Sequence, residues 1–349
     1  MKESESRACL PGIAEAELAA QLRAWSEKPF RLRQIQSWLY EKWEFSPEAM
    51  LNLPASLRAR LGETFGSPRS RVVEAQPGSG GTVKLLLELD DGEAIEMVLI
   101  PSPERMTFCL STQVGCPVRC RFCASGQDGL VRNLRVDEML EEFYHGVRRH
   151  GKMPDNLVFM GIGEGLLNYA ALQRTLEVLI DAVPAGFGLS PRRIAVSTSG
   201  YVPGMRKFAA WGKPFTLAVS LHAVDDATRA RLIPDYCRYP LAEILDAAAE
   251  YAEKSGRMVT FEYTLIAGVN DDLAMARELG RMAARLHAKV NLIACNPIGT
   301  EFRRPGEERL AAFRREVEAS CSSVTLRVEK GTSAASACGQ LRARRRDRE

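Results

Sequence analysis

From about residue 106 onward the sequence alternates between short apolar segments and longer amphipathic ones. The strand candidates are 106–112, 156–160, 192–197, 215–221, 258–265, 289–294 and 323–328, and the helix candidates are 136–149, 170–182, 204–211, 241–255, 273–286 and 306–320. Strands that alternate with helices imply right-handed βαβ crossovers and a parallel sheet. About six such units are too few for a closed eight-stranded barrel. We therefore predict an α/β fold, a partial (β/α)6 barrel with its chemistry at the carboxyl ends of the strands.

The first hundred residues have a different pattern. Apolar residues recur at helical spacing in segments 14–25, 31–43 and 56–65, and short strand candidates follow at 71–74, 83–89 and 94–100. The glycine-rich stretch 78–81 and the Asp90-Asp91-Gly92 turn separate these strands as hairpin turns. We predict a small N-terminal helical accessory domain over 1–70, a β-hairpin linker over 71–100 and a barrel core over 101–349.

The composition is that of an ordinary globular protein, with 46% hydrophobic and 26% charged residues. The N-terminus has no apolar segment typical of a secretory signal, and no apolar run approaches the length of a membrane span. We expect a cytoplasmic protein. The net charge of +3 indicates little about a nucleic-acid partner. Arg31, Arg33 and the arginine-rich tail 342–349 are either a solvated surface or phosphate contacts.

Three of the nine cysteines, Cys116, Cys120 and Cys123, form a C-x3-C-x2-C triplet just after the first barrel strand candidate. Three thiolates from one loop can bind three irons of a four-iron cluster and leave the fourth iron open. The amino and carboxylate groups of S-adenosylmethionine (SAM) can chelate that iron, and an electron passed to the sulfonium releases a 5′-deoxyadenosyl radical. A structural zinc site is the alternative, but it requires four ligands, and none of the four histidines lies at ligand spacing from the triplet.

The triplet and its flanks, Cys109–Cys116 and Gly129–Leu134, resemble the radical SAM adenine methyltransferases. These enzymes methylate carbon 2, or in the antibiotic-resistance branch carbon 8, of an adenine in 23S ribosomal RNA. The likeness runs from Lys28-Pro29-Phe30 to Ala337-Cys338-Gly339 and includes Gly161-Ile162-Gly163-Glu164. It implies a [4Fe-4S] cluster, two SAM molecules per turnover and an RNA substrate, which is 23S rRNA and in the carbon-2 branch also tRNA. It further implies an electron donor such as flavodoxin or ferredoxin, and a monomeric enzyme.

Several polar residues that follow strand candidates are expected to gather around one ligand at the top of the barrel. The resemblance assigns SAM contacts to seven residues, which are Gly163, Glu164, Ser197, Ser220, Leu221, His222 and Asn296. Without the resemblance, His222 would be read as a structural histidine and the GxGE sequence as a strand-to-helix turn. We expect the glycines to let backbone carbonyls approach the SAM ammonium group.

The resemblance also assigns three catalytic residues. Cys338 accepts a methyl group from one SAM, and its methyl carbon, activated by the radical, adds to the adenine ring. Cys109 then attacks the Cys338 sulfur and frees the methylated base as a transient disulfide forms. Glu96 matches the family's proton acceptor. Read without the family, Cys109 is a small buried apolar residue and Glu96 points from a strand into solvent.

Two other functions remain open at this stage. The same methyl-cysteine chemistry can act on carbon 8 or on a different nucleic-acid substrate. A protein of another class, a non-catalytic RNA-binding protein stabilised by a metal, would also contain a cysteine cluster and basic segments.

Overall fold

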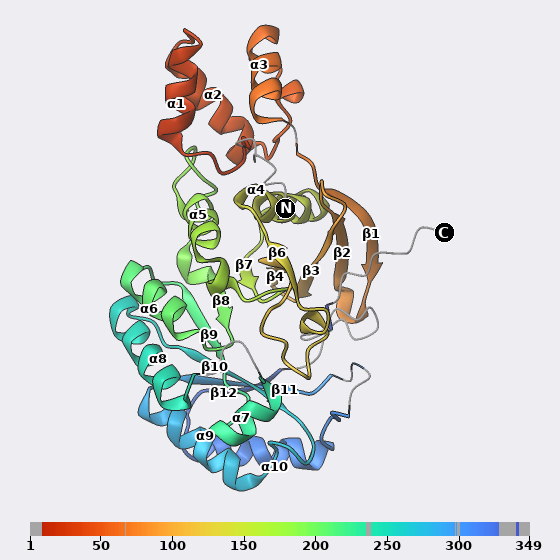
Figure 1. Cartoon of the computed structure of the whole chain (residues 1–349), viewed down its shortest axis with the longest axis vertical. Helices are drawn as coiled ribbons and strands as arrows, with labels where there is room; N and C mark the ends of the chain where they lie inside the picture. The colour runs from red at the N-terminus through yellow and green to blue at the C-terminus, as the bar shows by residue number, and fades with distance from the viewer. Residues whose placement is uncertain are drawn as a thin grey trace.

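Parallel strands form the centre of the chain, in an order that follows the sequence (Figure 1). The computed structural model describes residues 9–66, 68–234, 239–296, 298, 301–327 and 340–341. Neighbouring parallel strands are β4 (Arg105–Cys109), β7 (Asn156–Phe159), β8 (Ile194–Thr198), β9 (Thr216–Ser220), β10 (Thr260–Leu265), β11 (Lys289–Ala294) and β12 (Val324–Arg327). Because every strand points the same way, their carboxyl ends lie at one edge of the sheet.

A helix follows most of these strands and covers the outside of the curved sheet (Figure 1). These helices are α4 (Val136–His150), α5 (Tyr169–Ile180), α6 (Val202–Trp211), α8 (Leu241–Ser255), α9 (Leu273–Arg285) and α10 (Glu307–Glu318). The order of the described strands runs from β1 to β12 without pairing of the two ends, so the sheet stays open. The prediction of a partial (β/α)6 barrel is confirmed. A short helix that was not predicted, α7 (Asp226–Leu232), lies in the connection after β9.

The predicted hairpin strands extend this sheet beyond β4. They are β1 (Arg71–Pro77), β2 (Val83–Glu88) and β3 (Ala94–Ser102), and each is antiparallel to its neighbour. β3 also pairs antiparallel with β4, with Val98 opposite Cys109. The hairpin thus continues the hydrogen-bonded sheet of the barrel, while the boundaries at residues 70 and 100 remain predictions.

Three helices at the N-terminus stand beyond the barrel, next to α4 and α5 (Figure 1). They are α1 (Glu15–Ala24), α2 (Phe30–Gln36) and α3 (Ala55–Phe65). The predicted second helix is shorter than expected because the chain passes into a single π-helical segment at Ser37–Glu41. Aromatic contacts attach these helices to the core: the Phe45 ring stacks on Tyr144 of α4 at 4.6 Å, and the Tyr40 ring meets Phe187 edge-on at 5.2 Å.

The packing of α4 against the sheet depends on Gly146, because a Cβ there would lie 2.7 Å from Met97 Cε and 2.8 Å from Phe108 Cε2. We expect Gly146→Ala to lower the free energy of unfolding in urea by about 1 to 3 kcal/mol, the usual cost of overpacking. In the control Gly62→Ala, on α3, the Cβ would meet only a side-chain oxygen of Glu48 at 3.3 Å. That variant should keep the wild-type stability or gain less than about 1 kcal/mol. Equal stability of both variants would contradict this packing.

Candidate active site

The cysteine triplet lies in a loop that a short hairpin closes at its base. β5 (Gln113–Gly115) pairs antiparallel with β6 (Leu130–Asn133), and the Cys116 N–H donates to the Gly129 carbonyl at 2.8 Å. Gly115 has a φ of +74°, and a Cβ there would fall 2.0 Å from the Gly129 oxygen. Only glycine allows this closure. The sequence reading did not predict the hairpin, because its strands are very short.

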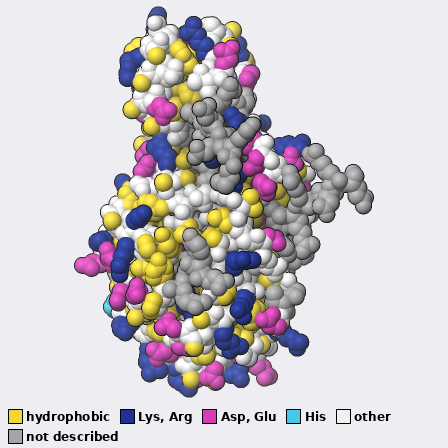
Figure 2. Space-filling model, in the orientation of Figure 1, with side chains coloured by type: hydrophobic (Ala, Val, Ile, Leu, Met, Phe, Trp, Pro, Cys, Tyr) yellow, Lys and Arg dark blue, Asp and Glu magenta, His cyan; other side chains and the backbone are white. Residues whose placement is uncertain are grey.

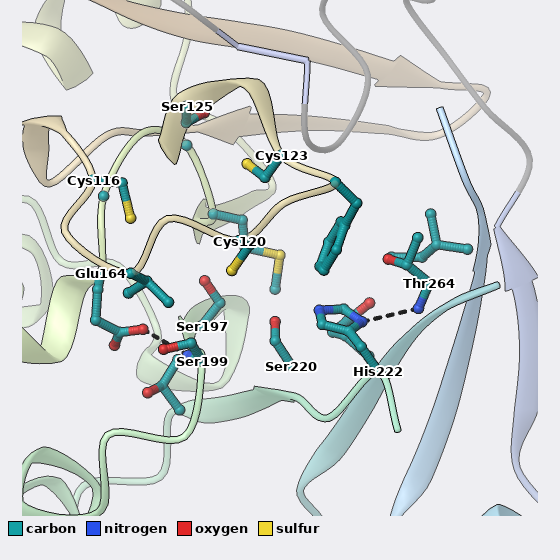
Figure 3. A pocket seen from close by; sticks show the side chains of 18 of the residues that line it. Cys116, Cys120, Cys123, Ser125, Glu164, Ser197, Ser199, Ser220, His222 and Thr264 are labelled. Carbon is teal, nitrogen blue, oxygen red and sulfur yellow. Dashed lines mark hydrogen bonds between the residues drawn. The ribbon is translucent and has the colours of Figure 1, made fainter. Parts of the chain in front are cut away.

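Apolar side chains between the cysteines hold the loop against the barrel. Val118 and Phe122 pack with Leu232 and Ile233 at the end of α7, and the backbone N–H of Arg121 donates to the Leu232 carbonyl at 3.0 Å. Val118 and Phe122 also line a pocket, and the three thiols lie along the same side of it (Figure 3).

The thiols need a positively charged partner to ionise. Burial raises the pKa of the Cys116 thiol to about 12, and it raises the pKa of Cys120 well above its usual value. Among the residues that the structure describes, no three Cys, His, Asp or Glu side chains lie close enough to share a single metal ion. A four-iron cluster binds each thiolate to a different iron, so its ligands need not converge on one point. The arrangement fits a cluster better than a mononuclear zinc site.

Across the pocket from the thiols lie the carboxyl ends of the parallel strands (Figure 3). The predicted residues Gly163, Glu164, Ser197, Ser220, His222 and Asn296 all line this pocket. Its empty volume is about 950 Å³, part of it open to solvent, within the range of cofactor pockets. Sulfur ligands on one wall and carboxylate, hydroxyl and imidazole groups on the other suit a cluster beside a ligand with both cationic and polar groups, as SAM is. The residues present therefore fit both groups.

Glu164 is one of two buried carboxylates that line the pocket, with 4% of its surface exposed. Its Oε2 accepts a hydrogen bond from the Ser199 N–H at 2.6 Å and its Oε1 accepts one from Leu166 N–H at 3.3 Å. Burial raises the pKa of this carboxyl, and the two N–H donors oppose the rise. A cationic ligand beside Glu164 would also favour its charged form.

The glycines before Glu164 have a packing role that differs from the predicted one. A Cβ on Gly161 would lie 2.7 Å from the Leu110 oxygen, and a Cβ on Gly163, where φ is +111°, would lie 2.7 Å from Thr112 Oγ1. The space that these glycines leave is filled by the segment leading from β4 to the cysteine loop. Glycine at these two positions lets the backbone beside Glu164 approach that segment closely. This packing requires glycine whether or not a ligand is bound.

His222 is held in one orientation and one protonation state. Its Nδ1 accepts a hydrogen bond from the Thr264 N–H at 3.0 Å, so the ring proton is assigned to Nε2 (Figure 3). Burial, aided by the charge of Arg229, lowers the pKa of His222 to about 3. His222 is therefore a neutral hydrogen-bond donor at physiological pH. The Phe122 ring of the cysteine loop meets the imidazole edge-on at 4.8 Å.

Leu221 differs from the other predicted SAM contacts. Its side chain is fully buried in the hydrophobic core and does not line the pocket. Its backbone N–H donates to the Glu262 carbonyl at 3.1 Å, and its own carbonyl accepts from Arg229. Leu221 would therefore contribute to SAM binding through its backbone and not through its side chain.

The sequence reading missed several residues that line the pocket, namely Met160, Ser199, Glu262, Thr264 and Arg327. Glu262 is nearly buried and its Oε2 accepts a hydrogen bond from Asn291 Nδ2 at 2.7 Å. Burial raises its pKa, and the charge of Arg327 opposes that rise. Glu262 and Thr264 alternate with apolar residues on β10, a pattern by which sequence reasoning could have assigned them to the inner face.

The sheet register places Glu96 and Cys109 on the same face of neighbouring strands. Val98 lies opposite Cys109, and side chains alternate along a strand, so Glu96, Val98 and Cys109 point to one side. The Ser111 hydroxyl donates to the Glu96 carbonyl at 2.8 Å. Glu96 is only 4% exposed, so it does not point into solvent, and its Oε1 lies 2.8 Å from Lys84 Nζ. This buried ion pair was not expected.

Cys338 lies outside the described residues. Leu341, which follows it by three positions, packs with Val98, Cys109 and Ile162. Its carbonyl accepts a hydrogen bond from the Ser125 hydroxyl, at 2.6 Å, just after the last cysteine of the triplet. The end of the Ala337–Leu341 motif thus lies between Cys109 and the cysteine loop.

The basic residues near the N-terminus differ in how exposed their side chains are and in whether they are bonded to neighbouring side chains. The Arg31 Nε lies 3.7 Å from Glu27 Oε2, and its Nη1 donates to Gln34 Oε1, whereas the side chains of Lys28 and Arg33 are exposed. Arg31, one of the candidate phosphate contacts, is therefore already bonded to side chains of its own helical region.

None of the described helices combines the length and the hydrophobicity that a membrane crossing requires.

Comparison with known proteins places this chain in a family. The Radical SAM superfamily pattern matches residues 110–280, and the pattern of the ribosomal RNA large subunit methyltransferase N-terminal domain matches residues 10–66. A probable dual-specificity RNA methyltransferase RlmN from Gloeobacter violaceus is 42% identical over 93% of this chain and 94% of its own length. The corresponding protein of Symbiobacterium thermophilum is 42% identical over 96% of this chain and 91% of its own.

A solved structure agrees with these relatives. The crystal structure of a radical SAM methyltransferase from Sphaerobacter thermophilus superimposes with a TM-score of 0.91 at 41% sequence identity, over 97% of this chain and all of that one. Likeness at this level extends through the N-terminal helices, the hairpin strands and the barrel. The chain therefore belongs to the RlmN family of radical SAM RNA methyltransferases.

Proposed function

We propose that this chain methylates carbon 2 of an adenine in 23S rRNA, and of an adenine in tRNA, through a methyl-cysteine on Cys338. One observation carries the proposal. The thiols of the cysteine loop face the polar strand ends across one pocket, and Leu341, at the end of the Cys338 motif, packs beside Cys109 and bonds to Ser125, which lines that pocket. These contacts support a reaction in which Cys109 and the cluster ligands take part in one site.

In this proposal Cys116, Cys120 and Cys123 hold the [4Fe-4S] cluster, and the strand ends hold SAM. Glu164 offers a buried carboxylate to the SAM ammonium group. The Ser197 hydroxyl donates to the Phe159 carbonyl at 3.0 Å, so its oxygen remains available to accept a hydrogen bond from the ligand. His222 offers a donor at Nε2, and Ser220 and Asn296 complete the polar wall. These contacts orient the ligand and exclude water on the sheet side.

The methyl group reaches the base through protein sulfur. Cys338 takes it from one SAM by polar displacement. When bound, the cluster and a second SAM would supply, with an electron from outside, the 5′-deoxyadenosyl radical that removes a hydrogen atom from the methyl group on Cys338. The Cys338 methylene carbon would then bond to the ring, the adduct would give up one electron to the oxidised cluster, and Glu96 would take the ring proton. The Cys109 thiolate would attack the Cys338 sulfur to form the disulfide, and the carbon released from the broken C–S bond would take up a proton, which leaves a methyl group on the base.

The Lys84–Glu96 pair supports the assignment of Glu96 as proton acceptor. The Lys84 ammonium, 2.8 Å away, is the ion-pair partner of the buried Glu96 carboxylate, the group that would accept the proton. Its place on the Cys109 face directs this base toward the reacting cysteines. A glutamate on an exposed strand face would have no such support.

RNA contact is proposed for the N-terminal domain and the open end of the barrel. On the face in Figure 2, Lys and Arg side chains lie on the N-terminal helices and over the lower half of the barrel, interspersed with acidic ones. Side chains of this kind contact the phosphates of RNA without distinguishing its base sequence. We further propose a cytoplasmic monomer that receives its electron from a flavodoxin or ferredoxin.

Mass spectrometry of ribosomal and transfer RNA tests the function. RNA from cells that lack the gene should gain 2-methyladenine when the wild-type gene is restored. Cys338→Ala should restore none, because the methyl carrier is absent, although the purified variant still cleaves SAM under reductant. The control Cys9→Ala should restore full methylation. 8-Methyladenine instead of 2-methyladenine would show the carbon-8 reaction, and methylation by Cys338→Ala would contradict the methyl-cysteine route.

Iron content tests the cluster. Anaerobically purified wild-type protein should be brown, with about four irons per chain. Cys120→Ala should lose nearly all of this iron, because only two thiolates remain, while Cys9→Ala should retain it. Colourless wild-type protein with a single zinc ion would instead support a non-catalytic, metal-stabilised protein.

The buried pair makes a separate prediction about stability. Lys84→Met leaves the Glu96 carboxylate buried without its ammonium partner, so the free energy of unfolding in urea should fall by about 3 to 5 kcal/mol. In the double variant Lys84→Met/Glu96→Gln no charge is left over, and most of the loss should be recovered. Methylation should not be recovered, because the base is gone. A double variant no more stable than Lys84→Met would argue against a buried ion pair.

A further inference from the structure

We propose that Arg229 is a positioning residue that locks the SAM-binding strand ends to the cysteine loop and places a positive charge near the cluster. The inference rests on the proposed function, since it assumes that the pocket holds a cluster and SAM. Arg229 lies on α7 and does not line the pocket. It would therefore act through the backbone and the electrostatic field.

The Arg229 guanidinium joins the ends of two strands. It is 4% exposed, and its Nη1 donates to the Ser220 carbonyl at 3.0 Å and to the Leu221 carbonyl at 2.6 Å. Its Nη2 donates to the Ser199 carbonyl. Ser199 directly follows β8, Ser220 is the last residue of β9, and Leu221 follows β9. Ser199 and Ser220 also line the pocket. A planar fork with several donors can bridge such groups, whereas a lysine ammonium cannot span them equally well.

The same short helix holds the cysteine loop. The Leu232 carbonyl accepts from Arg121 N–H, and Leu232 packs against Val118 and Phe122. Residues only three positions apart on α7 therefore hold the two halves of the site. A shift of this helix would change the distance between the thiols and the SAM-binding strand ends.

Neighbouring contacts fix α7 itself. The Asp225 carboxylate caps its first turn by accepting from Thr228 N–H at 2.7 Å, and Asp226 Oδ1 accepts from the Leu241 N–H, at the start of α8, at 2.8 Å. Gly200, with φ +98°, leaves the space for the guanidinium, because a Cβ there would lie 3.0 Å from Arg229 Nη2 and 2.7 Å from Ile244 Cδ1. The approach of Arg229 to the strand ends is thus built into the packing.

The charge of Arg229 lies next to the pocket. Its guanidinium is bonded to the carbonyls of Ser199 and Ser220, and both residues line the pocket together with the three thiols. A buried positive charge favours the more negative state of a nearby cluster, and so it raises the reduction potential. Arg229 would thereby ease delivery of the electron on which the reaction depends.

The test uses the reconstituted holoprotein and measures two quantities, the SAM dissociation constant and the midpoint potential of the cluster. Arg229→Met should weaken SAM binding by about tenfold to a hundredfold, as expected when a charged group's hydrogen bonds to the strand ends are lost. It should also shift the potential to a more negative value. Arg229→Lys keeps the charge but not the fork, so its potential should stay near that of the wild type while SAM binding remains weakened.

Arg231→Met is the matched control, because Arg231 lies on the same helix with an exposed side chain. It should match the wild type in both measurements. Wild-type values in Arg229→Met would overturn the inference. If Arg229→Met does not fold, Arg229→Lys decides alone: weaker SAM binding at the wild-type potential supports the inference, and wild-type binding overturns it. Failure of the wild-type holoprotein to bind SAM at its cluster would instead overturn the proposed function.

Discussion

The lateral pairing of parallel strands is the constraint on which the rest of this structure depends. Strands β4 and β7 to β12 pair in sequential order, so each crossover returns the chain to the same end of the sheet. Glu164, Ser197, His222 and Asn296 lie in or after different strands, yet they meet at one pocket. Without the register of the sheet, no local structure would bring these side chains together or opposite the cysteine loop.

Three buried carboxylates of the barrel have polar partners. Glu164 accepts two backbone N–H donors, Glu262 is bonded to Asn291, and Lys84 lies against Glu96. Burial of each group without its partner would cost several kcal/mol. Two of these carboxylates, Glu164 and Glu262, line the pocket, so the pocket depends on these hydrogen bonds. Leu and Phe side chains are prominent in the hydrophobic core around it.

The site also depends on two small elements that are held by packing. The β5–β6 hairpin closes the cysteine loop through Gly115, and α7 contacts both that loop and the strand ends. Neither is long enough to be stable alone. Their stability comes from the surrounding core, so the distance between the cluster ligands and the SAM side of the pocket is set by tertiary contacts.

The sequence alone determined the periodic elements and the residue chemistry. The strand Lys289–Ala294 and the helix Leu241–Ser255 have the predicted bounds, because their hydrophobic period decides which conformation buries the apolar face. The triplet Cys116, Cys120 and Cys123 likewise indicated a cluster by spacing and residue type. Short elements such as α7 carried no periodic signal.

Only the tertiary structure decided which distant side chains meet. It paired Lys84 with Glu96 and brought Arg229 to the carbonyls of Ser199, Ser220 and Leu221. It also placed the Leu221 side chain in the hydrophobic core, so that only the backbone of this residue is left for the SAM contact that the resemblance implies. These outcomes depend on strand register and on packing between segments far apart in the chain, and a pattern of neighbouring residues does not contain them.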